Sequence, residues 1–532
     1  MATRSLPSSP PSRAQTFWSA LFWGLICAAT LPGYLTPKGL WWVGGISLLP
    51  VLGLLFNTAN LPYPRWHSLL ASVGMALGVY GASVVWIIGV HPLAWVGLST
   101  VQSAFAAGLA WACWAGSTAL RFIPLGLLWG SPALIQRMSQ RWGGVLLPRP
   151  VMFMLLVTPI WLLGWALTIQ GITPLDMPWV GLHLSQTDNP WMPWIAHQLS
   201  PLPFPVSGLI ETSLIAAMAL LTGFIGNTLK GAKAFARLRL PAVWAITGSL
   251  LLITLSHEAP RFWKPPLPHP DATLSLAHGV LRPVAKSNSI AEIRGEARVS
   301  LRAAYQAAIP TSPHTTPLIV LLPEENLIAG WVSETNPWQN ADVASWQAWA
   351  NQHQTAVLMG ASTIDPNHGE APIGHNSIVA IVPATWYSGP PIVPMTHKRW
   401  LVPFGETVPT LGGLLPPDWL STVLYTVGNI HYDFPYAAGN AKLLTLPTPD
   451  GPLRIGGLVC VEVIDGFLAK SLARQGADVL VVVANTAWFQ GSARLTQQLN
   501  AQWLAHLQWR AWDAQRPIVY ADNRGKSAIL QP

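Results

Sequence analysis

The first half of the chain alternates long apolar stretches with short polar loops. A helix of about 20 consecutive apolar residues crosses the hydrocarbon core of a bilayer with its backbone hydrogen bonds made internally. Several stretches come close to that length, so we predict an N-terminal α-helical membrane domain of about seven transmembrane helices. They cover residues 17–35, 40–59, 69–90, 97–120, 151–169, 208–229 and 241–256.

Basic residues gather in alternate loops between these stretches, and short loops rich in Lys and Arg stay on the cytoplasmic side. Only Lys38 falls in the opposite set of loops. An odd number of spans with a cytoplasmic amino terminus places the second half of the chain outside the membrane. For a bacterium with two membranes, this predicts a multi-pass inner-membrane protein with a periplasmic second half. The residues on the cytoplasmic side are Arg4, Arg13, Arg65, Arg121, Arg137, Arg141, Arg149, Lys230, Lys233, Arg237 and Arg239.

After residue 256 the pattern changes to short apolar runs that alternate with helical stretches. Continuous apolar runs such as 479–483 are typical of strands buried on both faces, and their alternation with helices indicates an α/β domain. We predict a transmembrane domain over 1–256, a proline-rich linker over 257–271 and the α/β domain over 272–532. Strands are expected at 274–279, 318–323, 356–359, 377–382, 442–446, 453–461, 478–484 and 518–521, and helices at 294–309, 343–354, 466–475 and 493–515.

Composition supports this division of the chain. Hydrophobic residues make up 51% of the 532 residues and charged residues only 10%, whereas soluble domains average about 25% charged residues. Residues 1–256 carry a net charge of +9 and residues 257–532 a net charge of −1. The basic excess therefore belongs to the membrane half. No stripe of Lys and Arg interleaved with aromatic residues is present, which argues against nucleic acid as a partner.

The cysteines single out one residue of chemical interest. Cys27 and Cys113 fall in predicted spans, so Cys460 is alone in the exported half and has no partner there for a disulfide. Cys460 ends an apolar strand, and a helix is expected to begin at Gly466. The residue is either a small buried apolar side chain or a nucleophile at a strand-to-helix junction, where the helix dipole favours a thiolate.

Two charged residues lie at similar strand ends. Glu324 follows the apolar run 318–323, and Lys398 opens the stretch K-R-W-L-V-P-F-G-E-T-V-P. With the stretches at 460–462, 485–489, 510–517 and 523–525, the sequence resembles the nitrilase superfamily. Within it, the sequence is similar to the apolipoprotein N-acyltransferase family over nearly the whole chain. Some conjugal-transfer-associated (TraB-type) relatives share its departures from that family.

The resemblance implies an α-β-β-α sandwich and a set of catalytic roles. Glu324 is the expected general base, Lys398 the cation that favours the thiolate and the oxyanion, and Cys460 the nucleophile. The implied acyl donor is a phospholipid, and the acceptor is a lipoprotein or peptide amine. No metal or cofactor is expected. Glu406, Glu462 and Trp488 are the implied supporting residues.

Several alternatives stay open at the level of sequence. Glu325 competes with Glu324 as the base, but alternation along a strand points it to the other face. The same residues would serve an amidase-type hydrolase, with water in place of the amine. A conjugal-transfer or pilus-assembly component is the third reading, because Val461, Thr486, Asp513 and Tyr520 each depart from the usual family residue.

Two segments are candidates for contact with lipid. The loop 411–424 is rich in Gly and Pro and contains Trp419, so we expect either a mobile lid or a segment packed on the domain. The loop 170–207 contains Trp179 and other aromatic residues typical of a membrane interface. Glu211 is a lone acid inside a predicted span, which makes it a candidate functional residue or a hydrated helix start.

Overall fold

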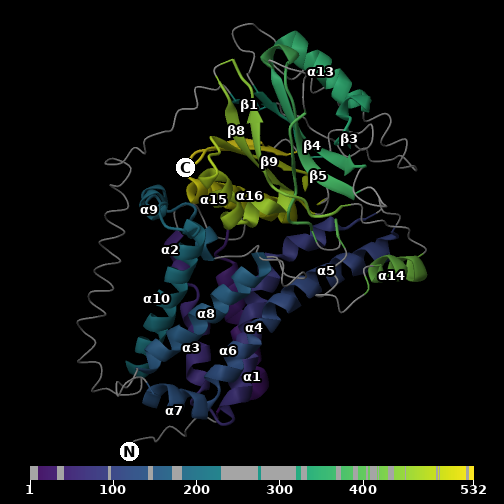
Figure 1. Cartoon of the computed structure of the whole chain (residues 1–532). Helices are drawn as coiled ribbons and strands as arrows, with labels where there is room; N and C mark the ends of the chain where they lie inside the picture. The colour runs from purple at the N-terminus through teal and green to yellow at the C-terminus, as the bar shows by residue number, and fades with distance from the viewer. Residues whose placement is uncertain are drawn as a thin grey trace, which may run out of the picture.

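The protein has a helical first half and an α/β second half, which lie one above the other in Figure 1. The structure is a computed structural model. It describes residues 10–32, 41–93, 98–141, 148–169, 182–228, 274–276, 319–324, 332–366, 373–387, 393–402, 405–407, 416, 418–428, 436–449, 451–486, 489, 492–522 and 527–532.

Helices occupy six of the seven apolar stretches, and the seventh, 241–256, lies outside the described residues. Two stretches are divided. The stretch 40–59 forms two helices, because Pro50 lacks an N–H and lies in the first turn of a new helix, where no intrahelical N–H bond is needed. The elements are α1 Arg13–Ala28, α2 Trp41–Ile46, α3 Leu49–Thr58, α4 Pro64–Ala76, α5 Thr100–Leu120, α6 Ile123–Trp129, α7 Pro132–Arg141, α8 Arg149–Ile169, α9 Met192–Leu199 and α10 Val206–Thr228.

The stretch 69–90 is the second divided stretch. It continues α4 into a π-helical segment, Leu77–Gly81, and then into a 3₁₀ helix, Val85–Val90. Among the described helices, Val206–Ile225 is long and apolar enough to cross a membrane. Thr100–Trp129 with Pro132–Met138 is a second if that bent pair counts as one span. The figure of about seven spans stays a prediction.

Basic residues from distant loops meet at one end of the helical half. The Arg13 guanidinium lies over the rings of Tyr63 and Trp66, 5.5 and 5.6 Å from their centroids. Arg149 donates to Asn60 Oδ1 at 2.8 Å. The amino-terminal side of the chain and α7 lie at this end, opposite the α/β half (Figure 1).

The second half contains two sheets, with strands at all eight predicted places. The first has the order β1-β2-β4-β5-β6, with β3 paired to β4, and the second has the order β11-β10-β9-β8-β7. Three short strands, β3, β6 and β11, were not predicted. The bounds are β1 Leu274–Leu276, β2 Ile319–Leu321, β3 Val332–Ser333, β4 Ala356–Asp365, β5 Ile373–Ile381, β6 Met395–His397, β7 Leu443–Leu446, β8 Leu453–Val459, β9 Val479–Ala484, β10 Ile518–Asp522 and β11 Ala528–Leu530.

The sheets pack face to face between two layers of helices. Alternate residues of β9 point to different cores: Val481 packs between the sheets, and Val482 packs beneath the helices. Helix α13 (Ala341–His353) covers the first sheet, while α15 (Gly466–Arg474) and α16 (Ala493–Ala514) cover the second. This is the expected α-β-β-α order. The predicted helix at 294–309 and the linker at 257–271 lie outside the described residues.

Helices α15 and α16 lie between the sheets and the helical half (Figure 1). Helix α16 contacts α9, α10 and both the 3₁₀ helix Val85–Val90 and the 3₁₀ helix Leu182–Gln186. Strand β8, which Cys460 directly follows, belongs to the same sheet that these helices cover. The helical half therefore reaches the neighbourhood of Cys460 through α15 and α16.

Candidate active site

Cys460 follows the last residue of β8 and begins the 3₁₀ helix Cys460–Ile464, as the strand-to-helix pattern predicts. Its φ is +53°, in the left-handed region that costs a residue with a side chain about 1–2 kcal/mol. Asp465 then caps α15 by accepting from the N–H groups of Phe467 and Leu468. The sharp turn presents the thiol at the end of the sheet instead of continuing the strand.

Glu324 lies in the turn after β2 and is 4% exposed. Its Oε1 accepts from Asn376 Nδ2 at 2.6 Å, and its Oε2 accepts from the Asn485 N–H at 2.9 Å. The carboxylate is also close enough to the Cys460 thiol to raise the pKa of that thiol. Burial raises the pKa of the Glu324 carboxyl, and the Lys398 ammonium partly opposes that shift.

Lys398 directly follows β6 and is fully buried. Its Nζ lies 2.8 Å from both carboxylate oxygens of Glu406 and 4.0 Å from Glu324 Oε1. Burial is the largest single effect and acts to lower the pKa of Lys398, but the Glu406 and Glu324 carboxylates together with Cys460 outweigh it and raise that pKa. The ammonium therefore stays charged beside two carboxylates.

Asn376, on β5, connects the two carboxylates and was not predicted. Its Nδ2 donates to Glu324 Oε1 at 2.6 Å and to Glu406 Oε1 at 2.7 Å. Its backbone carbonyl accepts from the Lys398 N–H at 2.7 Å. Asn376 thus contacts both acids and fixes the strand end that carries the lysine.

Glu462 links the backbone that follows Lys398 to the backbone that precedes Cys460. Its Oε1 accepts from the N–H groups of Arg399 and Trp400 at 2.7 and 3.2 Å, and its Oε2 accepts from the Val459 N–H at 2.8 Å. Burial raises the pKa of Glu462 to about 7, against the opposing effect of these donors. The side chain holds backbone in place rather than facing the thiol.

The environment of Cys460 favours a neutral thiol. Burial raises the pKa of the Cys460 thiol well above its ordinary value, and the Glu324 carboxylate adds to the shift, while Lys398 acts in the opposite direction. Lys398 therefore acts in the predicted direction, because its ammonium lowers the pKa of the Cys460 thiol. Its effect does not outweigh burial, so the pKa of the thiol is raised overall. A neutral thiol needs a base to remove its proton before it can act as a nucleophile, and the Glu324 carboxylate is the acid that acts most strongly on this thiol.

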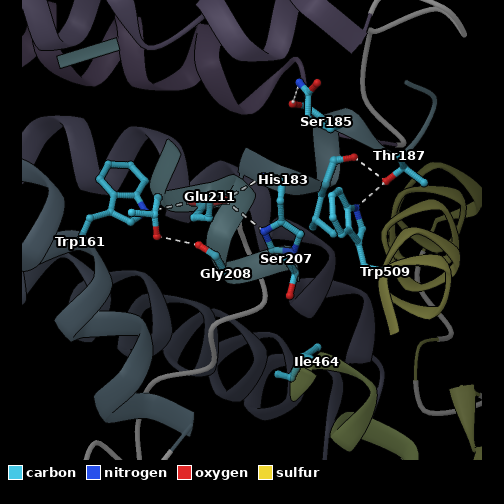
Figure 2. Close-up of polar contacts among 12 residues, drawn as sticks. Trp161, His183, Ser185, Thr187, Ser207, Gly208, Glu211, Ile464 and Trp509 are labelled. Atoms are coloured by element: carbon cyan, nitrogen blue, oxygen red, sulfur yellow. Dashed lines mark hydrogen bonds and ion pairs between the residues drawn. The ribbon is translucent and has the colours of Figure 1, made fainter. Parts of the chain in front are cut away.

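The other predicted residues divide into two groups. Trp488, Trp179 and Glu325 lie outside the described residues. Trp419 begins helix α14 (Trp419–Gly428) and is partly buried. Glu211 lies in the helical half, where its carboxylate accepts from the indole N–H of Trp161 and from the backbone N–H of His183 (Figure 2).

Thr486, one of the departures from the family pattern, is hydrogen-bonded to a buried carboxylate. Its hydroxyl lies 2.9 and 2.8 Å from the two carboxylate oxygens of Asp522, which is buried at the end of β10. A carboxylate at position 486 would face that of Asp522 at close range, whereas the Thr hydroxyl donates to it. The threonine is therefore compatible with an intact turn next to Asn485, whose N–H binds Glu324.

Gly360 on β4 makes room for the base. A Cβ at this position would lie 2.4 Å from Glu324 Cα, and the Gly360 N–H donates to the Pro323 carbonyl at 3.1 Å. We expect Gly360→Ala to displace Glu324 and to lower the alkylation and acylation rates of Cys460 by about tenfold or more. Peptide mass spectrometry of labelled Cys460 would measure this. Gly108→Ala, where the space is open, is the control, and equal rates in the two variants would contradict the prediction.

Known proteins resemble this chain in both of its halves. Residues 305–532 match the carbon-nitrogen hydrolase family. An apolipoprotein N-acyltransferase from Parasynechococcus marenigrum (strain WH8102) is 24% identical over 527 residues, which cover 97% of this chain and 90% of that protein. An apolipoprotein N-acyltransferase from Vibrio vulnificus (strain CMCP6) is also 24% identical, covering 90% of this chain and 85% of that protein.

Among solved structures, a carbon-nitrogen hydrolase from Helicobacter pylori G27 matches 44% of this chain and 74% of its own, with 17% identity and a TM-score of 0.30. The two acyltransferases match both the helical and the α/β half, whereas the hydrolase family covers only the latter. The chain is therefore similar over both halves to the apolipoprotein N-acyltransferases, and its residues 305–532 match the carbon-nitrogen hydrolase family.

Proposed function

We propose that this protein is a membrane-bound N-acyltransferase that moves an acyl chain from a phospholipid to the terminal amine of a diacylglyceryl-cysteine lipoprotein. The observation that carries the proposal is the meeting of the Cys460 thiol, the Glu324 carboxylate and the Lys398 ammonium at one end of the two sheets. Relatives of that name match the helical half as well as the α/β half.

The first half-reaction is acylation of the thiol. Glu324 takes the proton from Cys460, the sulfur attacks the ester carbonyl of the phospholipid, and Lys398 stabilises the negative charge that develops on the carbonyl oxygen. The ester C–O bond then breaks, and Glu324 returns the proton to the leaving lysophospholipid oxygen. The acyl chain remains on Cys460 as a thioester.

The second half-reaction is transfer to the amine. The neutral amino terminus of the acceptor attacks the thioester carbonyl, the C–S bond breaks, and the proton of the amine passes through Glu324 to the departing sulfur. An amide forms on the acceptor and the thiol is restored. Glu406 supports both steps by holding Lys398, and Glu462 supports them by holding the backbone after Lys398 and the backbone before Cys460.

The arrangement of charge supports a periplasmic site. Basic loops gather at the end of the helical half that is opposite the α/β half, and such loops stay in the cytoplasm. A multi-pass protein of the bacterial inner membrane would then hold Cys460 on the periplasmic side, where the phospholipid and the lipoprotein acceptor are both within reach. The relatives named above give no support to the conjugal-transfer alternative.

The test is mass spectrometry of the full-length protein mixed with phospholipid vesicles that carry a labelled acyl chain. We expect an acyl adduct on Cys460 that persists in buffer and is discharged by a synthetic diacylglyceryl-cysteine peptide. Discharge by water at the same rate without peptide would replace the transferase by a hydrolase. The absence of any adduct on Cys460 would overturn the proposal. Cys460→Ala is the control for adducts at other sites.

Trp419 is proposed to act on lipid donors at the edge of helix α14, which also exposes Val423 and Tyr425. We expect Trp419→Ala to slow acylation from vesicle phospholipid about tenfold while changing acylation from a short soluble ester less than twofold. Stopped reactions analysed for the Cys460 adduct give both rates. Tyr425→Ala on the same helix is the control, because it shows whether the loss of any exposed aromatic residue slows acylation from vesicles. Equal losses of rate on the two donors would contradict the lid interpretation.

A further inference from the structure

Helix α16 presents buried polar side chains to the helical half. Gln502 accepts from the indole N–H of Trp86 at 3.0 Å and donates to the Ser83 carbonyl at 3.1 Å. The Trp509 indole N–H donates to Thr187 Oγ1 at 3.1 Å. Buried polar groups need partners, and here residues of the helical half supply them. The two halves are therefore joined by directed hydrogen bonds as well as by apolar packing.

Arg510 is the charged member of this face and is 1% exposed. Its Nη1 donates to the Ile464 carbonyl at 2.7 Å, and its Nη2 donates to Ser207 Oγ at 3.0 Å. The same Nη2 lies 2.8 Å from Asp513 Oδ2. Ile464 is the last residue of the 3₁₀ helix that begins at Cys460, which we call the nucleophile turn. One guanidinium therefore binds both this turn and the helical half.

Asp513 completes the connection at the start of α10. Its Oδ1 accepts from the Ser207 N–H at 2.8 Å, and its Oδ2 accepts from the Ser207 hydroxyl at 2.9 Å. A carboxylate in this place satisfies a free N–H of the first helical turn and is favoured by the helix dipole. Space is tight: a Cβ on Gly466 would lie 2.7 Å from Asp513 Oδ2 and 3.0 Å from Pro205 Cβ.

The same helix, α10, is fixed again one turn later. Figure 2 shows Glu211 between Trp161 and His183. The Glu211 carboxylate accepts from Trp161 Nε1 at 3.0 Å and from the His183 N–H at 2.8 Å. The His183 ring packs edge-to-face on Trp509, with the ring centroids 5.1 Å apart. The start of α10 is thus fixed relative to α8, to the 3₁₀ helix Leu182–Gln186 and to α16.

We infer that Arg510, with Asp513 and Ser207, is a positioning residue that sets the geometry of the Cys460 turn from the start of α10. A buried ion pair adds little stability compared with apolar residues of the same size. A guanidinium, however, fixes several acceptors in one plane, and here the acceptors belong to the nucleophile turn and to the helical half. Thiol reactivity in this enzyme then depends on the membrane half. The acylation measurement that tests this inference rests on the proposed function.

Three variants test the inference in the full-length protein. Arg510→Lys keeps the charge beside Asp513 but cannot bind Ile464 and Ser207 as a planar fork. Ser207→Ala is a mild variant that removes only the hydroxyl. Arg454→Lys is the matched control, because Arg454 forms an exposed pair with Asp478. Each protein is measured for its melting temperature, its alkylation by iodoacetamide and its acylation from phospholipid vesicles.

Alkylation is followed on the Cys460 peptide, with the Cys113 peptide as an internal reference. We expect Arg510→Lys to slow alkylation and acylation of Cys460 about tenfold or more at temperatures where the protein is folded. Ser207→Ala should slow both about two- to fivefold, and Arg454→Lys should change neither. The Cys113 alkylation rate should be the same in all proteins.

The outcomes separate this inference from the proposed function. A folded Arg510→Lys protein whose Cys460 reacts at the unmodified rate would show that the residue only anchors the two halves, and would overturn the inference. If Arg510→Lys does not fold, the inference is overturned when Cys460 of Ser207→Ala reacts as fast as Cys460 of the unmodified protein. Slowed alkylation in both variants, together with no acyl adduct in the unmodified protein, would support the positioning role and reject the acyltransferase.

Discussion

Glu324→Gln is expected to lower the rate of Cys460 acylation by about 10²- to 10⁴-fold, the usual contribution of a general base. The amide oxygen can still accept from Asn376 or Asn485, so the local backbone should keep its place. What is lost is the acceptor for the thiol proton. Burial and the surrounding carboxylates raise the pKa of the Cys460 thiol, so almost no thiolate forms without a base.

The pH profile gives the same residue a second test. Because the pKa of Glu324 is raised by burial, the carboxyl is protonated, and inactive as a base, at pH values where an ordinary glutamate is still ionised. The acylation rate should therefore fall as pH decreases through a midpoint above about 4.3, the unperturbed value for Glu. In Glu324→Gln this acid limb should disappear, and the remaining slow rate should rise with pH as the thiol ionises.

Adduct formation on Cys460 at a series of pH values measures both effects. Glu334→Gln is the control, because Glu334 contacts Thr363 and His397 and has no bond to the thiol. A Glu324→Gln protein that is acylated within threefold of the unmodified rate would exclude Glu324 as the base. The outcome would then direct attention to Glu325 or to a group outside the described residues.

The strands of the α/β half could be predicted because their signal is local. Residues 479–483 are all apolar, and five such residues in a row report burial on two faces without reference to partners. Strand β6 has no comparable signal, since only Met395–His397 belong to it and Pro394 precedes them. The strand exists because its residues pair with β5, and pairing across the chain cannot be inferred from three residues.

The site shows the same division. Cys460 and Glu324 each follow an apolar run, so the sequence predicts their place at strand ends. Asn376 lies within β5, and nothing beside it in the chain indicates a role; its partners, Glu324 and Glu406, are 52 and 30 residues away. The pairing of Lys398 with Glu406 is likewise a product of the fold, although the two residues lie eight positions apart.

The helical half contains changes of helix type that a count of apolar residues cannot detect. Hydropathy located the stretch 69–90, but it cannot detect where the hydrogen-bond pattern changes from α to π and to 3₁₀. That change matters for function, because Ser83 and Trp86 at the end of this stretch bind Gln502 of α16. Two of the contacts that join the two halves are therefore made where the regular helix stops.

Lys398→Met is expected to abolish acylation and also to destabilise the α/β half by about 3–5 kcal/mol, the usual cost of removing one partner of a buried ion pair. Met fills the volume of the lysine stem but leaves the Glu406 and Glu324 carboxylates buried without the ammonium that lies 2.8 and 4.0 Å from them. The melting temperature should fall. Lys442→Met, at an exposed lysine of the same half, should leave both properties unchanged.

A double variant separates the two effects of the lysine. Adding Glu406→Gln to Lys398→Met removes one of the two unpaired charges and keeps a carbonyl oxygen for one of the two donors, Asn376 or Val402. The double variant should therefore melt at a higher temperature than Lys398→Met alone, while acylation of Cys460 stays undetectable because no cation remains for the oxyanion. If acylation returned together with stability, Lys398 would be a structural residue, and charge stabilisation would have to come from backbone N–H groups of the nucleophile turn.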